Sequence, residues 1–210
     1  MDKTNLQQVF VFPLQDIVFY PHTVVPLNIF EPRYIRMVED SLKTGTPIAL
    51  VMSQKAQTGR KIATKFSGVV AGMGEPKILH ENSDGSMIII LKGTGKVVLH
   101  EIIDDKPYFS CWASLIAENE EVNPENKFRI HRFQKILKQW VTENLEDPSE
   151  RMHFLKAMRS PEQMVDSMAM FFIEDSDERQ SILEKNDINQ KIEFLSQHLN
   201  NLNPAADGEK

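Results

Sequence analysis

The sequence predicts an α+β protein in which a strand-rich half with one helix precedes a helical half. From residue 9 to 116, short apolar runs alternate with Gly, Pro, Asp and Asn, which is typical of strands. Beyond residue 126, apolar residues recur every three or four positions, which is typical of amphipathic helices. The acidic stretch 118–126 separates the two patterns. We therefore predict one subdomain over residues 1–117, a small barrel or strongly curved mixed sheet, and a second over residues 118–210.

The first half begins with two predicted strands, over residues 9–14 and 17–20. Pro21 and Pro26 then bracket an extended segment, because proline supplies no hydrogen-bond donor to a ladder and favours sheet edges. A helix follows, with Pro32 in its first turn and Gly45 as its stop signal. Its apolar positions are Tyr34, Ile35, Val38 and Leu42.

Further strands and turns fill the rest of the first half. The predicted strands cover residues 47–52, 62–73, 78–80, 87–91, 96–103 and 108–116, and residues 53–61 are expected to form a surface loop. Gly68, Gly72 and Gly74 are interpreted as bends or bulges. The string from Gly93 to Lys96 lacks the spacing of a phosphate-binding loop and leads into a strand, so we interpret it as a turn between strands.

The second half is predicted to be helical throughout, with a frayed tail over residues 203–210. Its first helix carries an apolar stripe formed by Phe128, Phe133, Ile136, Leu137, Trp140 and Val141. Pro148 opens a short helix, and the string from Ser160 to Gln163 has the pattern of a capping box. Another helix follows Ser176, and Asp187 precedes the last one.

Bulk properties argue against several classes of function. The formal net charge is -6 and no basic stripe is evident, so the chain is not expected to bind nucleic acid. No apolar run approaches the length of a membrane span. The single cysteine, Cys111, cannot form an internal disulfide and is expected to be a buried, inert thiol. With no signal-peptide pattern at the start, a reducing, cytoplasmic location is expected.

No motif indicates catalysis, and we expect no cofactor. None of the six histidines has another four residues away, and a Cys-x-x-Cys pair is absent, so no metal site is predicted. No serine lies in a Gly-x-Ser-x-Gly elbow. Five methionines fall between Met152 and Met170, and they either fill a core or line a surface that accepts partners.

Three stretches carry a resemblance to a known family. The first holds Phe12-Pro13-Leu14, Pro21, Pro26-Leu27 and the run Ile-Phe-Glu-Pro-Arg-Tyr over residues 29–34. The second covers residues 84–102 and the third residues 177–199. Together they resemble the N-terminal domain of Lon-type ATP-dependent proteases, including its stand-alone bacterial members, over residues 9–200. Two positions depart from the family pattern, Lys96 where arginine is usual and His22 where glycine is common.

The resemblance implies a PUA-like barrel of mixed strands with one helix, followed by a helical bundle. It also implies a recognition module without the ATPase and Ser-Lys peptidase of Lon, binding unfolded or tagged polypeptide segments or a protein partner, as an adaptor or regulator of proteolysis. An apolar groove between barrel and bundle would serve this role. The candidate residues are Phe30, Arg33 and Tyr34 on the barrel side, with Met164, Met168 and Phe171 opposite.

Three alternatives stay open at this point. Phe30 to Tyr34 could be a strand-to-helix junction held by packing, with Arg33 paired to a carboxylate across it. An RNA-binding role follows from PUA-like barrels by analogy of fold alone. A small-ligand enzyme would require residues that only the fold brings together. The sequence does not indicate the oligomeric state.

Overall fold

A computed structural model describes residues 6–53 and 66–202 of the chain. The chain divides into two compact units, Met1–Ile116 and Ala117–Lys210, which we name the barrel unit and the helical unit. The boundary predicted from the sequence lies one residue later along the chain. Each unit has buried apolar residues of its own, and the α+β class predicted from the sequence is confirmed.

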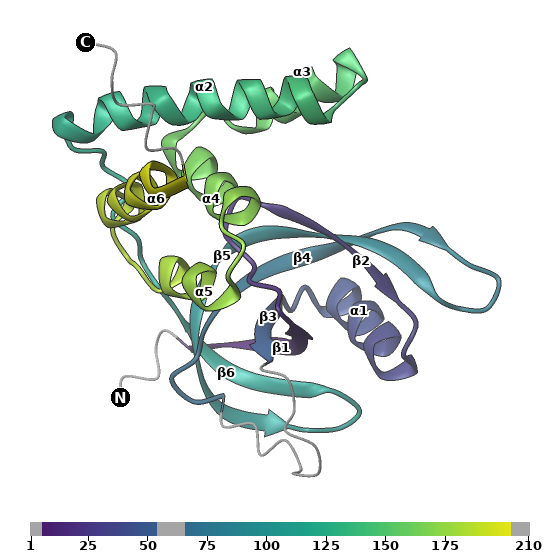
Figure 1. Cartoon of the computed structure of the whole chain (residues 1–210). Coiled ribbons are helices and arrows are strands. Elements are labelled where there is room, and N and C mark those ends of the chain that lie inside the picture. The colour runs from purple at the N-terminus through teal and green to yellow at the C-terminus, as the bar shows by residue number, and fades with distance from the viewer. Residues whose placement is uncertain (1–5, 54–65, 203–210) are drawn as a thin grey trace. The chain divides into compact units, whose positions relative to one another are not determined.

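The described part of the barrel unit forms a six-stranded sheet with the order β2-β5-β4-β3-β1-β6. Its strands are β1 (Leu6–Gln15), β2 (Val24–Ile29), β3 (Ile48–Ser53), β4 (Val70–Glu81), β5 (Met87–Asp104) and β6 (Phe109–Leu115). β1 and β3 run parallel, and the other pairs are antiparallel. The far half of β5 also pairs with β6, so that the sheet closes on itself and β2 lies outside the ring (Figure 1).

Alternate strand residues fill the core of the barrel unit. Val9 and Val11 of β1 are buried with Ala49 of β3 and with Cys111 and Ala113 of β6. This is the two-residue period of strand side chains that share one face. Phe10 and Phe12, on the other face of β1, are buried as well. Burial raises the pKa of the Cys111 thiol to about 11, so the predicted buried thiol is confirmed and stays protonated at neutral pH.

The helix α1 (Pro32–Thr44) follows β2 after only two residues. Pro32 occupies the first turn as predicted, and Gly45 ends the helix with a φ of 72°, its amide donating to the carbonyl oxygen of Ser41. Such left-handed backbone favours glycine because it has no Cβ. Tyr34, Met37 and Val38 are buried, and the helix contacts β4 and β1.

The prediction of a strand over residues 17–20 is wrong. This segment has no regular structure, and it crosses the sheet at glycines. A Cβ added to Gly72 would lie 1.9 Å from the carbonyl oxygen of Phe19, and one added to Gly93 would lie 2.4 Å from that of Tyr20. The chain can pass this closely only because those positions lack a side chain. At the following turn, His22 has a φ of 62°, a conformation that suits the glycine common in the family.

The predicted turn at Gly93 to Lys96 is also wrong, because these residues continue the single strand β5. The register against β4 shifts between Met73 and Gly74, which pair with Gly95 and Gly93 and leave Thr94 as the extra residue. The two glycines that suggested a turn therefore belong to a β-bulge within the strand. β4 is likewise one strand where two were predicted, and residues 62–65 and most of the predicted loop lie outside the described residues.

The described part of the helical unit contains a 3-10 turn, η2 (Pro124–Asn126), and α-helices. They are α2 (Lys127–Asn144), α3 (Pro148–Ala157), α4 (Pro161–Phe172), α5 (Ser176–Leu183) and α6 (Ile188–Leu202). α2 contacts α3, α4 and α6, and α4 also contacts α5 and α6. The predicted capping box is confirmed. The Ser160 hydroxyl accepts from the backbone N–H of Gln163, and the side-chain oxygen of Gln163 accepts from the backbone N–H of Ser160. Asp187 caps α6 by accepting from the amide of Asn189.

One residue of the predicted apolar stripe on α2 does not face the core. Phe133, Leu137 and Val141 are buried, whereas the Phe128 side chain is 65% exposed. Position 128 lies five residues before Phe133, which at 3.6 residues per turn places it on the opposite side of the helix. No helix among the described residues is both long and apolar enough to cross a membrane.

Candidate functional site

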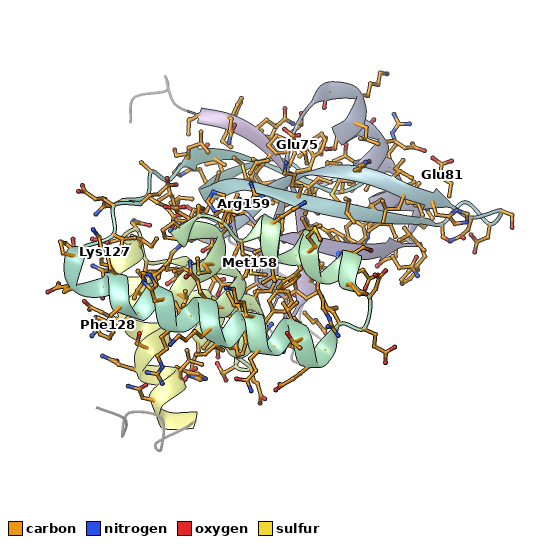
Figure 2. The ribbon with its side chains drawn as sticks, turned by 90° about the horizontal axis from the view of Figure 1, so that it is seen from above. Glu75, Glu81, Lys127, Phe128, Met158 and Arg159 are labelled. Carbon is orange, nitrogen blue, oxygen red and sulfur yellow. The ribbon has the colours of Figure 1, made fainter. Side chains whose placement is uncertain are left out.

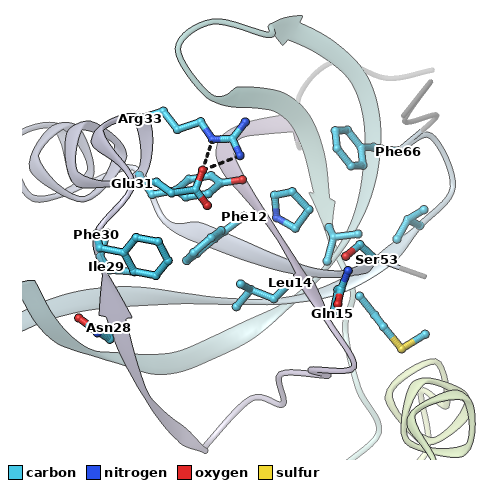
Figure 3. Close-up of a pocket in the computed structure, with 15 residues that line it drawn as sticks. Phe12, Leu14, Gln15, Asn28, Ile29, Phe30, Glu31, Arg33, Ser53 and Phe66 are labelled. Atoms are coloured by element: carbon cyan, nitrogen blue, oxygen red, sulfur yellow. Dashed lines mark hydrogen bonds and ion pairs between the residues drawn. The ribbon is translucent and has the colours of Figure 1, made fainter. Parts of the chain in front are cut away.

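A pocket with a volume of about 690 Å³ opens in the barrel unit. It lies where the ends of β1, β2 and β3 meet the start of α1, and Figure 3 shows its lining. The lining residues are Phe12, Pro13, Leu14, Gln15, Asn28, Ile29, Phe30, Glu31, Arg33, Tyr34, Val51, Met52, Ser53, Phe66 and Val69. A pocket of this size and apolar character is typical of ligand-binding sites.

Phe30 is the most exposed large apolar residue that lines this pocket. Its side chain is 68% exposed because it stands in the short connection between β2 and α1, where neither element covers it. Figure 3 shows its ring at one side of the pocket and Phe66 at the other, with Phe12 and Leu14 between them. An exposed ring beside an apolar pocket gives a partner a surface to cover.

Arg33 and Tyr34 form the polar edge of the pocket together with Glu31. The Arg33 guanidinium lies 2.7 Å from the Glu31 carboxylate and 4.6 Å from the centroid of the Tyr34 ring. The Tyr34 ring in turn packs on Phe12 at 4.2 Å between centroids. Burial raises the pKa of the Tyr34 hydroxyl, while Arg33 opposes that rise, so the phenol stays neutral and can donate a hydrogen bond.

Six of the residues that line the pocket have polar side chains. Beyond Arg33 and Glu31, these are the hydroxyls of Tyr34 and Ser53 and the amides of Gln15 and Asn28. In the described part of the chain, none of these four groups is hydrogen-bonded to a base that could activate a nucleophile. Among the residues that the structure describes, no group of His, Cys, Asp or Glu is placed to hold a metal ion.

The structure places the two predicted halves of the site in different units. Phe30, Arg33 and Tyr34 come together around the pocket, and the strand-to-helix junction that was the alternative for them is also present. On α4, Met164 and Met168 are 1% and 0% exposed. Of the two alternatives for the methionines, this burial favours filling of the core. Their part in a recognition groove stays a prediction.

Phe171, the third residue predicted on that side, is 39% exposed. Its ring stacks on Trp140 of α2 at 5.1 Å and lies 5.5 Å from Phe154 of α3. Phe171 therefore belongs to an aromatic cluster at the surface of the helical unit. A role for it in partner binding stays a prediction.

Sequence reasoning missed most of the apolar lining, including Phe12, Leu14 and Phe66. Phe12 and Leu14 belong to the motif that carried the family resemblance, so their place beside Phe30 could have been proposed from it. Phe66 gave no such signal. It lies outside that motif in the sequence and joins the pocket lining only in the fold.

The chain is similar to part of known proteases. It is 25% identical over 196 residues to the Lon protease of Escherichia coli strain K12, covering 92% of this chain and 25% of that protein. It is 22% identical over 185 residues to the Lon protease of Buchnera aphidicola subsp. Acyrthosiphon pisum, covering 88% and 24%. The chain thus spans about a quarter of the length of these relatives.

Solved structures show the same fold. The Lon N-terminal domain protein from Xanthomonas campestris matches with a TM-score of 0.64 and 18% identity, over 91% of this chain and 98% of that one. The N-terminal domain of Mycobacterium avium complex Lon protease matches with a TM-score of 0.64 and 12% identity, over 91% and 97%. The family model of the ATP-dependent protease La (LON) substrate-binding domain matches residues 8–201. The chain therefore belongs to the LON substrate-binding domain family.

Proposed function

We propose that this chain is a polypeptide-recognition module that binds apolar segments of unfolded or tagged proteins in the pocket of the barrel unit. The observation that carries the proposal is the exposed ring of Phe30 beside an apolar pocket of about 690 Å³. The family is described as substrate-binding, and the substrates of proteases are polypeptides. The role is binding without chemistry, in which the chain acts as an adaptor for proteolysis or as its regulator.

The lining supports an apolar peptide as the ligand. The rings of Phe12, Phe30 and Phe66 line the pocket, with Phe30 exposed and the other two almost fully buried, and Arg33 and Asn28 supply hydrogen-bond donors. Unfolded chains expose apolar side chains together with free backbone groups, and folded proteins bury most of both. Such a pocket therefore discriminates an unfolded from a folded polypeptide.

The test is a binding titration with one protein in two states. Fluorescein-labelled lactalbumin, either reduced and carboxymethylated or native, is titrated with the intact chain, and anisotropy is followed. We expect the unfolded form to bind and the native form to bind at least about tenfold more weakly. Phe30→Ala should weaken binding of the unfolded form by about tenfold or more, as truncation of a central aromatic contact does at protein interfaces.

The matched control is Leu79→Ala, which truncates another exposed apolar side chain of the barrel unit outside the pocket. This variant should bind as the parent does. Both positions are exposed, so circular dichroism should show intact folds. Equal losses in the two variants, or equal binding of native and unfolded lactalbumin, would refute the pocket as the recognition site.

A further inference from the structure

The helix α2 concentrates positive charge in a unit that is otherwise acidic. Of its six Asp, Glu, Lys and Arg residues, five are basic, and Glu143 is the exception. The overall charge of -6 gave no sign of a basic stripe, because acidic residues elsewhere in the chain hide it. Figure 2 shows Lys127 and Phe128 at the beginning of this helix.

Four of the basic or imidazole side chains lie on one exposed face of α2. These are Lys127, His131, Lys135 and Lys138, which we name the basic row. Their spacing of four, four and three residues keeps them on one side of a helix, opposite Phe133 and Leu137, over about 16 Å. Within residues 6–53 and 66–202, no carboxylate forms an ion pair with the three lysines.

The remaining basic residues of α2 are held by their own chain. Arg129 donates to the side-chain oxygen of Asn126 and lies over the Phe128 ring at 5.1 Å. Arg132 donates to the side-chain oxygen of Asn200 at 2.6 Å. In the basic row, Nδ1 of His131 donates to the carbonyl oxygen of Lys127 at 2.9 Å.

The basic row works against the stability of its own helix. Lys127 lies in the first turn, where the helix dipole disfavours positive charge by roughly 0.3–1 kcal/mol. Within the row, Lys135 and Lys138 also lie three residues apart, and a like-charge pair at such spacing costs an isolated helix about 0.2–0.5 kcal/mol. Both effects make the basic row unfavourable within its own helix. An external anion that binds the row would offset them.

We propose that the basic row is a docking surface for a short acidic segment of a protein partner. Along the chain, the basic row is flanked on both sides by exposed acidic residues. They are Glu120, Glu121 and Glu125 before α2, and Glu143, Glu146, Asp147 and Glu150 at and beyond its end. A partner segment of three or four carboxylates with neutral or basic flanks matches this alternation of sign.

A uniform polyanion matches it less well. A nucleic-acid strand carries about one charge per 3.4 Å without interruption. The row itself covers only about 16 Å, and the nearest charged residues along the chain before and after α2 are acidic, so the sequence offers a longer strand no continuation of the row. The exposed Phe128 ring beside Lys127 adds an apolar contact for a side chain that flanks the acidic segment. This surface belongs to the helical unit and is independent of the pocket proposed for unfolded chains.

The test uses a labelled peptide of about 12 residues, with glutamates three and four positions apart on an alanine background and glutamines at those positions in its control. The intact chain should bind the acidic peptide about tenfold more tightly than the glutamine peptide at low salt, and this preference should shrink at about 150 mM salt. Replacing Lys127, Lys135 and Lys138 with Gln should weaken binding of the acidic peptide by about tenfold or more. The single variant Lys135→Glu should act in the same direction.

The matched control replaces Lys77, Lys92 and Lys106 with Gln, which changes the net charge equally in the barrel unit. It should bind the acidic peptide as the parent does. The row variant should be at least as stable to heat as the parent and should still bind unfolded lactalbumin, which separates this proposal from the pocket.

Four results would overturn the proposal. The first is equal binding of the two peptides by the parent, and the second is equal loss in the row and control variants. The third is tighter binding of an oligothymidylate or oligouridylate through the row than of the acidic peptide. The fourth is a parent that sediments as an oligomer and a row variant that sediments as a monomer, which would make this face a contact between copies of the chain.

Discussion

Each of the two units contains a cationic side chain that forms an ion pair. The pair in the barrel unit is exposed to water, whereas the one in the helical unit is buried. In the barrel unit, Arg33 pairs with Glu31 at the edge of the pocket, and their side chains are 52% and 43% exposed. In the helical unit, Lys191 of α6 lies 2.8 Å from Glu118 and 3.2 Å from Asp166 of α4, and its side chain is only 4% exposed. Water screens the first pair and hardly reaches the second.

This difference assigns the two cations different roles. Burial alone would lower the pKa of Lys191, but Asp166 and Glu118 raise it above its usual value, so Lys191 stays charged at neutral pH. It ties α6 and α4 to the segment that begins the helical unit. Arg33 does not connect buried elements in this way, and its guanidinium remains accessible to a ligand. Buried charge here supports the fold, and exposed charge is available for recognition.

The largest effect is expected from Lys191→Met. The substitution removes the ammonium group that lies 3.2 Å from Asp166, whose side chain is 1% exposed, and breaking a buried pair in this way costs about 3–5 kcal/mol. The free energy of unfolding is measured in urea from the fluorescence of Trp140 in a Trp112→Phe background, so that the signal reports the helical unit. Adding Asp166→Asn should recover part of the loss, because it removes the buried negative charge that Lys191 balances. A loss below about 1 kcal/mol would contradict the structural role of Lys191.

The raised pKa of Lys191 also sets a pH dependence. Since the folded pKa lies above the unfolded one, the contribution of Lys191 is fully present below the unfolded value of about 10.4. It is lost as the pH rises through the folded pKa. The difference between parent and Lys191→Met should therefore persist at neutral pH and narrow only in strong alkali.

A contact of intermediate exposure connects α1 to the start of β6. The Tyr108 hydroxyl donates to the Asp40 carboxylate at 2.8 Å, and Arg36 lies 3.0 Å from the same oxygen. Tyr108→Phe removes that hydrogen bond and keeps the edge-on ring contact with Phe10. We expect a loss of about 1 kcal/mol in the free energy of unfolding at pH 7, reported by Trp112 fluorescence in a Trp140→Phe background.

The Tyr108→Phe effect should vanish in acid. The hydrogen bond from Tyr108 holds the pKa of Asp40 below its usual range, so the stabilisation is present above the unfolded value of about 3.9. It is lost as the pH falls through the lower, folded pKa. Equal losses at pH 7 and at low pH would show that the hydroxyl acts through packing and not through the charged carboxylate.

Local signals were enough to predict the helices. Gly45 after α1, Pro32 at its start and the Ser160–Gln163 box each act within one turn, so the sequence carries the whole cause. The strand predicted over residues 17–20 and the turn predicted over residues 93–96 were both wrong, because the causes of the observed structure are distant in the sequence. Gly72 and Gly93 are needed where another segment crosses over them, and no local pattern reveals that crossing.

The site shows the same limit. Phe30 and Arg33 could be proposed because they belong to a continuous motif, and the structure places them at one pocket. Phe66 joins them from a distant part of the chain, and the basic row on α2 was hidden in a net charge of -6. Helical spacing can reveal such a row once the helix is known, because residues four apart share a face.

The smallest effect on stability is expected from Arg33→Ala. Exposed ion pairs contribute about 0–1 kcal/mol, and the Glu31 carboxylate left behind stays in contact with water. If the pocket recognises polypeptides, the same variant should weaken binding of unfolded lactalbumin by several-fold, because the rim loses its cation. Arg33→Lys should recover only part of that loss, since a lysine keeps the charge but not the planar contact with the Tyr34 ring. A variant that binds unfolded lactalbumin as the parent does but unfolds more easily would show that Arg33 has the structural role assigned to Lys191. The proposed difference in role between the exposed and the buried cation would then be refuted.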